Sequence, residues 1–174
     1  RVRRWTLLPL ALLAVAVWAN PGVDLPAVKS SGEVLLPNGW RIQPAGEQLE
    51  IDVGALGMAL SPNGARLAVL HCGVPKHSVM LLDAPGQRIL HQLPIAKGWV
   101  GICFSSDGRR LYVSGGSDDV VRVFRVGIAR LSEDGNIPVK ADGETATQFV
   151  AQVATSPDGR LLYAALMKGK CGSV

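Results

Sequence analysis

The stretch that decides the fold is Gly101-Ile-Cys-Phe-Ser-Ser-Asp-Gly-Arg-Arg-Leu-Tyr-Val-Ser114, because the same pattern occurs twice more in the chain. The other copies are Gly57-Met-Ala-Leu-Ser-Pro-Asn-Gly-Ala-Arg-Leu-Ala-Val-Leu70 and Gln152-Val-Ala-Thr-Ser-Pro-Asp-Gly-Arg-Leu-Leu-Tyr-Ala-Ala165. Their turn glycines, Gly64, Gly108 and Gly159, lie 44 and 51 residues apart. A period of about 40–50 residues built on short strands and tight turns is typical of β-propellers. The sequence therefore predicts an all-β fold of the β-propeller class.

Each copy has the composition of a β-hairpin turn. Proline sets φ near about −65° at the start of the turn, Asn or Asp bonds to the backbone two residues on, and glycine takes a positive φ without a clash. Aliphatic runs around such a glycine turn indicate a hairpin. The apolar residues that flank the turn are Met58, Leu60, Ile102, Phe104 and Val153 before it, and Leu67, Val69, Leu111, Val113 and Leu162 after it.

The segments between the copies predict the outer strands of each blade. In the first unit we expect strands at 78–83 and 88–95, joined by a turn at 84–87. In the second unit we expect strands at 120–126 and 129–139. Upstream, residues 39–43 and 47–53 are expected to pair around Pro44-Ala-Gly46, as a strand pair that completes the last blade of a closed ring.

These elements predict a domain organisation. Residues 36–174 are expected to form an incomplete propeller, with the N-terminal strand pair, two full blades and the start of a third, after a linker at 20–35. Because repeat units cannot bury their faces alone, we expect the sequence to be a fragment of a protein with about seven blades. The open last unit would expose unpaired strand edges, which favour aggregation.

Residues 1–19 have the layout of a secretory signal peptide. Arg1, Arg3 and Arg4 precede an uncharged, mostly apolar run from Trp5, and Val17-Trp18-Ala19 offers small residues where a peptidase cleaves. An uncleaved membrane anchor remains the alternative, although the run is shorter than the roughly 20 residues of a spanning helix. We therefore expect an exported protein, periplasmic or extracellular, with no membrane contact after cleavage.

The charge balance carries no nucleic-acid signal. The whole chain has 18 basic and 14 acidic residues, a net charge of +4, and three of the basic residues lie in the expected signal segment. Without them the net charge is +1, and no basic stripe occurs elsewhere. We expect no nucleic-acid partner.

The three cysteines are an odd number for an exported chain. Cys103 aligns with Ala59 and Ala154, so its position favours a small, buried residue. Cys72 aligns with Gly116 at a strand end, where it could pair with a residue in the part of the propeller that this sequence does not include. A disulfide between any two of Cys72, Cys103 and Cys171 remains open, because no spacing favours one.

Two groups of residues are candidates for metal binding. His71, Cys72 and His77 lie close in sequence, but zinc sites need three or four ligands and no fourth lies nearby. Asp118 and Asp119 follow Gly115-Gly-Ser117 in a loop between the second and third strands, where a solvated turn is the simpler interpretation. We expect ordinary loop and strand-end residues at both places.

The remaining candidates also favour structural roles. Gly115-Gly116 forms no phosphate cradle, since no helix follows it. Trp40 and Trp99 are expected to pack between blades, and His91 to be exposed on an outer strand. No constellation of serine, cysteine and histidine for nucleophilic catalysis can be assembled. We therefore predict no catalytic, cofactor-binding or metal-binding residue and no cofactor in this sequence.

The repeats resemble the YVTN-type β-propeller repeats of exported bacterial proteins, over residues 36–167. More narrowly, 36–46, Met58-Ala-Leu-Ser-Pro62 and Lys97-Gly-Trp-Val-Gly-Ile-Cys-Phe-Ser105 resemble a group that joins such a propeller to a C-terminal phosphoesterase domain of the alkaline-phosphatase superfamily. The resemblance implies metal-dependent hydrolysis by residues beyond Val174. The chain departs from the pattern at His71-Cys72-Gly73, where polar residues are usual, and at Ala164-Ala-Leu-Met167.

Three functions remain open. The first is an exported propeller module that binds or scaffolds an unknown protein or small-molecule ligand, without catalytic activity of its own and with a C-terminal domain in cis. The second is the accessory domain of a metal-dependent phosphoesterase, as the resemblance implies. The third is a propeller lactonase, which predicts Glu, Arg and His on the innermost strands. Those strands (residues 58–60, 102–104 and 153–155) offer almost none, so the third ranks last.

Overall fold

A computed structural model describes residues 27–28, 32–43, 45–46, 48–73, 76–140 and 146–168. The chain divides into two compact units, residues 1–48 and 49–174, which are described separately. The expected signal segment at 1–19 and Cys171 lie outside the described residues. Within the described ranges, no helix is long and apolar enough to cross a membrane.

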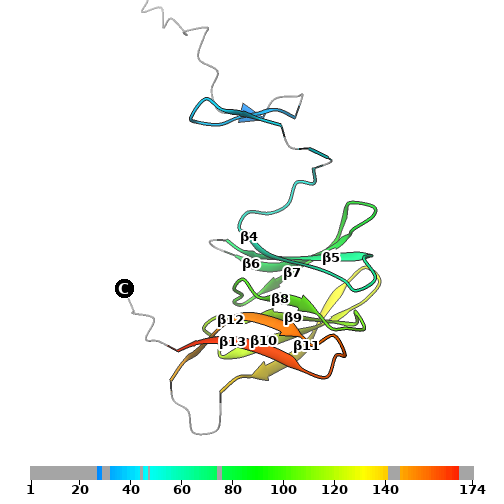
Figure 1. Ribbon diagram of the computed structural model, residues 1–174, viewed down its shortest axis with the longest axis vertical. Helices are drawn as coiled ribbons and strands as arrows, with labels where there is room; N and C mark the ends of the chain where they lie inside the picture. Colours follow the sequence, from blue (N-terminus) through cyan, green and yellow to red (C-terminus); the bar gives the residue numbers. More distant parts are fainter. Residues whose placement is uncertain are drawn as a thin grey trace, which may run out of the picture. The chain divides into compact units, whose positions relative to one another are not determined.

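The second unit consists of three antiparallel sheets that follow one another along the chain, from cyan to red in Figure 1. The third sheet pairs β12 (Gln148–Thr155) with β13 (Leu162–Lys168). The first two sheets have four strands each, in sequence order. They are β4 (Ala55–Leu60), β5 (Arg66–Cys72), β6 (His77–Asp83) and β7 (Arg88–Ile95), then β8 (Ile102–Phe104), β9 (Arg110–Ser114), β10 (Val120–Val126) and β11 (Leu131–Pro138). These are the blades of a β-propeller, and they confirm the predicted all-β fold class.

The outer strands agree closely with the sequence prediction. The expected strands at 88–95 and 120–126 are β7 and β10, with the same bounds. The expected strand at 78–83 begins one residue earlier in β6, and the one at 129–139 is shorter in β11.

The three repeat turns are built alike. In the first, the hydroxyl of Ser61 donates to Asn63 at 2.8 Å and accepts the N–H of Arg66 at 2.8 Å. Asn63 in turn accepts the N–H of Ala65 at 3.1 Å, and Gly64 has a φ of +69°. The same bonds recur around Ser105 and Ser156. The sequence predicted the roles of the Asx residue and glycine but missed the serine, which joins both ends of the turn.

The hydrophobic core lies between the blades. Ala68 and Leu70 of the first blade form a buried cluster with residues of the second, which include Ile102 and Phe104. The side chains between them in sequence, such as Val69, belong to a different cluster on the opposite face of the first blade. This alternation is the period-2 pattern of a strand that is covered on both faces.

A side chain also joins the first two blades. The guanidinium of Arg66 donates to the backbone oxygen of Ile128 through Nε at 3.1 Å and Nη2 at 2.7 Å. It also pairs with Asp83 of its own blade at 3.2 Å. Arg66 therefore ties the turn end of the first blade to the second.

The strand pair predicted near the N-terminus is wrong. Residues 39–43 and 47–53 were expected to pair, but β3 (Arg41–Ile42) pairs with β2 (Val34–Leu35), and the described residues 48–53 form no strand. A tight turn explains the difference, because Gly39 has a φ of +82° and Leu36 accepts its N–H at 2.9 Å. With β1 (Ala27–Val28), these strands form a small sheet inside unit 1–48, partly within the stretch expected to be a linker.

We predict that Gly64→Ala lowers the free energy of unfolding by about 1–2 kcal/mol, because an L-residue is strained at this positive φ. An added Cβ would meet nothing within 4 Å, so the strain is isolated from any steric clash. Urea unfolding measures the change. Gly64→Asn serves as the matched control and should cost less, since Asn tolerates this conformation better. Equal losses for the two variants would contradict the explanation.

Candidate functional site: a pocket at the inner strands

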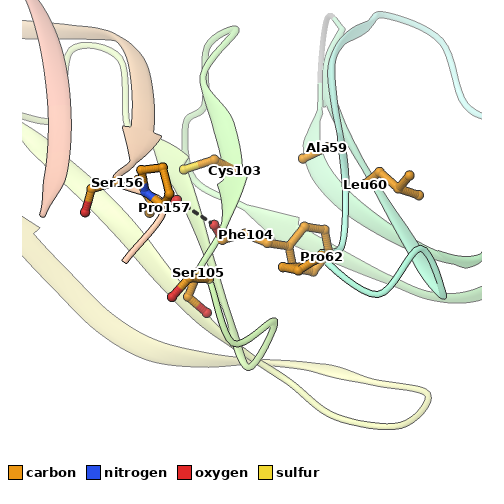
Figure 2. Close-up of a pocket in the computed structure, with 10 residues that line it drawn as sticks. Ala59, Leu60, Pro62, Cys103, Phe104, Ser105, Ser156 and Pro157 are labelled. Carbon is orange, nitrogen blue, oxygen red and sulfur yellow. Dashed lines mark hydrogen bonds between the residues drawn. The ribbon is translucent and has the colours of Figure 1, made fainter. Parts of the chain in front are cut away.

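A pocket of about 460 Å³ lies where the inner strands of three blades end. Figure 2 shows Leu60 and Pro62 on one side, Ser156 and Pro157 on the other, and Cys103 and Phe104 between them. Each inner strand (β4, β8 and β12) leads into a repeat turn at this place, so the three copies contribute equivalent positions. The lining residues are Ala59, Leu60, Pro62, Cys103, Phe104, Ser105, Ser106, Thr155, Ser156 and Pro157.

Three of the four lining hydroxyls have structural partners. Thr155 Oγ1 donates to the backbone oxygen of Phe104 at 3.0 Å and so joins the second blade to the third. Ser105 and Ser156 donate to the carboxylates of their own turns, at 2.6 Å and 2.5 Å. These hydroxyls are held in place by the fold.

Ser106 differs from the other turn residues. It stands where the other copies have Pro62 and Pro157, and it is exposed. Its hydroxyl has no hydrogen-bond partner among the described residues. It lies against Gly159, where an added Cβ would come within 2.1 Å of Ser106 Oγ. Ser106 is therefore the lining hydroxyl that is available to a ligand. Sequence reasoning missed it, although its departure from the Ser-Pro pattern was a signal.

The lining is electrically neutral. None of the ten residues that line the pocket in the described part of the chain carries a carboxylate, imidazole, guanidinium or ammonium group. The ionisable group among them is Cys103, where burial raises the thiol pKa to about 11. At neutral pH this thiol stays protonated and is a poor nucleophile. The pocket can bind by hydrogen bonds and apolar contact, but these side chains supply no general base.

The first metal candidate does not assemble. His77 Nδ1 accepts the N–H of Gly98 at 3.0 Å, and Cys72 Sγ bonds to the backbone oxygen of Trp99 at 3.3 Å. His71 is 1% exposed, and neither ring nitrogen has a hydrogen-bond partner among the described residues. Within those residues, no group of three His, Cys, Asp or Glu side chains is placed to hold a metal. Cys72 and Cys103 are free thiols.

The two aspartates are engaged in ion pairs. Asp118 pairs with Lys97 at 2.9 Å and with Arg122. Asp119, at a φ of +58°, pairs with Lys140 at 2.8 Å, and this bond holds the pKa of its carboxyl below the ordinary value. The loop position between β9 and β10 is as predicted, but the carboxylates bind cationic side chains.

Asp119 also bonds to the backbone on both sides of the connection between the second and third blades. Its carboxylate accepts the N–H of Gln148 at 2.5 Å, and its backbone oxygen accepts the N–H of Val139 at 3.0 Å. Close by, the backbone oxygen of Gly116 accepts the N–H of Val150 at 2.9 Å. This loop therefore joins the second blade to the third.

The predicted environments of Trp99, Trp40 and His91 can be compared with the structure. Trp99 packs edge-on against Phe149 of the third blade, with ring centroids 5.3 Å apart, as expected for a residue between blades. Trp40 is 70% exposed and belongs to unit 1–48, outside the blades, so its expected packing between blades stays a prediction. It follows the tight turn at Gly39 in unit 1–48, where its N–H bonds to Asn38. His91 is half-buried rather than exposed, because its Nδ1 accepts the N–H of Leu131 at 3.2 Å.

The comparisons with known proteins support the fold. No model of a known protein family matches the sequence, and no curated protein is similar. Solved structures do match. The hydrazine synthase of Kuenenia stuttgartiensis is 24% identical with a TM-score of 0.54, over 70% of this chain and 32% of its own. The periplasmic gluconolactonase of Pseudomonas aeruginosa is 24% identical with a TM-score of 0.52, over 66% of this chain and 34% of its own.

A third structure, a putative 6-phosphogluconolactonase from Bacteroides uniformis, is 19% identical with a TM-score of 0.52. The match covers 77% of this chain and 43% of that one. The chain thus spans about a third to less than half of the structures it matches. At these identities the likeness shows that the three sheets are blades of a β-propeller, and it does not extend to the YVTN repeat group or a phosphoesterase fusion.

We predict that Cys103 resists alkylation in the folded chain. A thiol pKa of about 11 instead of 9.0 leaves about 100-fold less thiolate at pH 8 than in an ordinary cysteine. Iodoacetamide labelling followed by peptide mass spectrometry measures this, with the urea-unfolded chain as the control. Equally fast labelling of Cys103 in both states would contradict the burial.

We predict that His71 makes the fold less stable at acidic pH. Burial lowers the pKa of its imidazole, although the charge of Asp52 opposes this. The unfolded chain takes up a proton near pH 6.5 while the folded chain resists, so stability is full above that pH and falls as pH falls below it.

The test is urea unfolding of the wild type and of His71→Leu at pH 7 and pH 5. Leucine is the residue of the third copy at this position, Leu166. The variant should lose less stability on acidification than the wild type. An identical loss in both proteins would show that His71 does not contribute.

Proposed function

We propose that this chain is a propeller binding module whose inner-strand pocket takes a small, uncharged, polyhydroxylated ligand of the sugar-lactone class. The observation that carries the proposal is the neutral lining of the pocket, formed by hydroxyl groups and apolar side chains from three blades. An uncharged ligand fits such a site, because no buried charge has to be compensated. The free hydroxyl of Ser106 supplies a hydrogen bond, and Pro62, Phe104 and Pro157 supply apolar surface.

The choice of ligand class has two supports. Two of the similar structures are named as a gluconolactonase and a putative 6-phosphogluconolactonase. The lining lacks a cationic side chain, which favours an unphosphorylated lactone over a phosphorylated one.

Lactone hydrolysis is the second candidate, favoured by the names of the same two structures. Opening a lactone needs an activated water or another nucleophile. Neither the protonated Cys103 nor the bonded hydroxyls of Ser105, Thr155 and Ser156 provide one. The hydroxyl of Ser106 is not bonded in this way, but the lining holds no imidazole or carboxylate that would activate it. Binding without turnover therefore ranks first. An accessory role beside a phosphoesterase domain rests on the resemblance of the repeats alone.

The proposal predicts weak binding of glucono-δ-lactone, with a Kd of about 1 mM for a ligand of this size. Ligand-observed NMR measures it. Ser106→Pro removes the free hydroxyl and should weaken binding about 5–10-fold, the value of one hydrogen bond. Proline occurs at this position in the other two copies, so the turn should be retained.

Ser132→Ala, on the exposed outer strand β11, is the matched control and should bind like the wild type. No binding of the lactone at several times the expected Kd would reject the proposal. Lactone hydrolysis faster than the spontaneous rate, followed in a pH-indicator assay, would instead favour the lactonase.

A further inference from the structure

Two segments of the described chain carry the same tripeptide, Pro-Asn-Gly. One is Pro37-Asn-Gly39 in unit 1–48, and the other is Pro62-Asn-Gly64 in the first repeat turn. An asparagine that precedes glycine is chemically labile, because glycine has no side chain to shield its backbone nitrogen from the side-chain amide of the asparagine. Both asparagines, Asn38 and Asn63, are exposed, so water reaches them and ammonia can leave. The two segments therefore form a matched pair for spontaneous deamidation.

The attacking backbone nitrogen is held alike in the two segments. The N–H of Gly64 donates to the backbone oxygen of Ser61 at 2.8 Å, and the N–H of Gly39 donates to that of Leu36 at 2.9 Å. Both glycines have a positive φ, of +69° and +82°. Each nitrogen must leave its hydrogen bond before it can attack the asparagine side chain, so this step does not distinguish the two sites.

The side-chain oxygens differ in the number of hydrogen-bond donors that they accept. Asn63 Oδ1 accepts the hydroxyl of Ser61 at 2.8 Å and the N–H of Ala65 at 3.1 Å. Among the described residues, Asn38 Oδ1 accepts one donor, the N–H of Trp40 at 3.1 Å. When a nitrogen attacks the side-chain amide carbon, negative charge develops on this oxygen, and donors already aimed at it stabilise the transition state. The first repeat turn therefore supplies one such donor more than the turn at Asn38.

The other two repeat turns hold an aspartate at the position of Asn63. Asp107 accepts the hydroxyl of Ser105 at 2.6 Å and the N–H of Arg109 at 3.0 Å, which are the bonds that Asn63 accepts in its own turn. Asp158 accepts the two equivalent bonds in the third turn, at 2.5 Å and 3.1 Å. The hydrogen bond from Ser105 holds the pKa of the Asp107 carboxyl below its ordinary value. A turn of this kind thus stabilises a carboxylate at this position.

We propose that the first repeat turn promotes the deamidation of Asn63 to aspartate. The backbone nitrogen of Gly64 loses its proton and bonds to Cγ of Asn63, while the side-chain nitrogen takes up a proton and leaves as ammonia. The product is a five-membered succinimide that joins residues 63 and 64. Water then adds to Cγ and breaks its bond to the Gly64 nitrogen, which regains a proton. The net reaction consumes water, releases ammonia and converts the amide into a carboxylic acid, which ionises at neutral pH.

The turn also favours one of the two products of succinimide hydrolysis. Water that adds to the backbone carbonyl carbon of residue 63 yields isoaspartate, which places an extra carbon in the main chain. The donors Ser61 Oγ and Ala65 N–H instead lie on the oxygen of Cγ, so they polarise the carbon whose attack restores the normal chain. Aspartate keeps the hydrogen bonds that the other two copies make, whereas isoaspartate moves the carboxylate away from them.

The test is incubation of the folded chain at mildly alkaline pH and physiological temperature, followed by peptide mass spectrometry at intervals. Asn63 should convert about 5-fold faster than Asn38, which is the value of one additional hydrogen bond. In the chain unfolded with guanidinium, where the bonds from Ser61 and Ala65 are absent, the two sites should convert at similar rates. The share of aspartate among the products at residue 63 should be larger from the folded chain. Asn63→Asp provides the chromatographic standard that separates aspartate from isoaspartate.

Asn136 is the internal control, because it is exposed on β11 but precedes Ile137, whose branched side chain shields the backbone nitrogen. It should stay intact while Asn63 converts. Ser61→Ala removes one donor and should slow Asn63 to about the rate of Asn38.

Three results would overturn the proposal. They are conversion of Asn63 no faster than that of Asn38 in the folded chain, the same share of aspartate from the folded and unfolded chains, and an unchanged or faster rate in folded Ser61→Ala. If Ser61→Ala does not fold, the first two comparisons, which use the wild type, decide the matter.

Discussion

The fold depends on the serine of the repeat turn. Its hydroxyl bonds forward to the Asn or Asp side chain and accepts the N–H that opens the next strand, as in the pair of bonds made by Ser105 to Asp107 and Arg110. Each inner hairpin is thereby closed by its own residues, before any other blade is in place. The three turns make the same kinds of bond, and the pocket lies where the three inner strands lead into them.

The blades need one another in a way that the turns do not. A strand such as β5 directs Leu70 to one neighbour and Val69 to the other side, so a blade cannot be covered on both faces by itself. Burial of Leu111 and Val113 depends on the first blade, and burial of Val153 depends on the second. The fold is therefore a chain of nearest-neighbour contacts, strongest in the middle blade, which has a partner on each side.

The sequence correctly predicted the structural features that are determined locally and that recur in each repeat. Asx residues, glycines and alternating aliphatic residues identified the hairpins and outer strands, because their geometry is determined within a few residues. The predicted strand pairing was wrong where two local patterns compete. At Gly39 a tight turn pairs Arg41–Ile42 with Val34–Leu35 instead of with the residues that follow. The sequence could not show that, among the described residues, the hydroxyl of Ser106 and the ring nitrogens of His71 lack hydrogen-bond partners, since this depends on segments distant in the chain.

Asp119 has a consequence for how this architecture can vary. It binds Val139, Lys140 and Gln148, so both ends of the connection to the third blade are fastened to one residue. The second repeat spacing is seven residues longer than the first. The entropy of closing a loop grows only slowly with its length, so a connection whose ends are clamped accepts insertions at little cost to the blades. This makes the connection a place where the propeller can gain new sequence while its blade geometry stays unchanged.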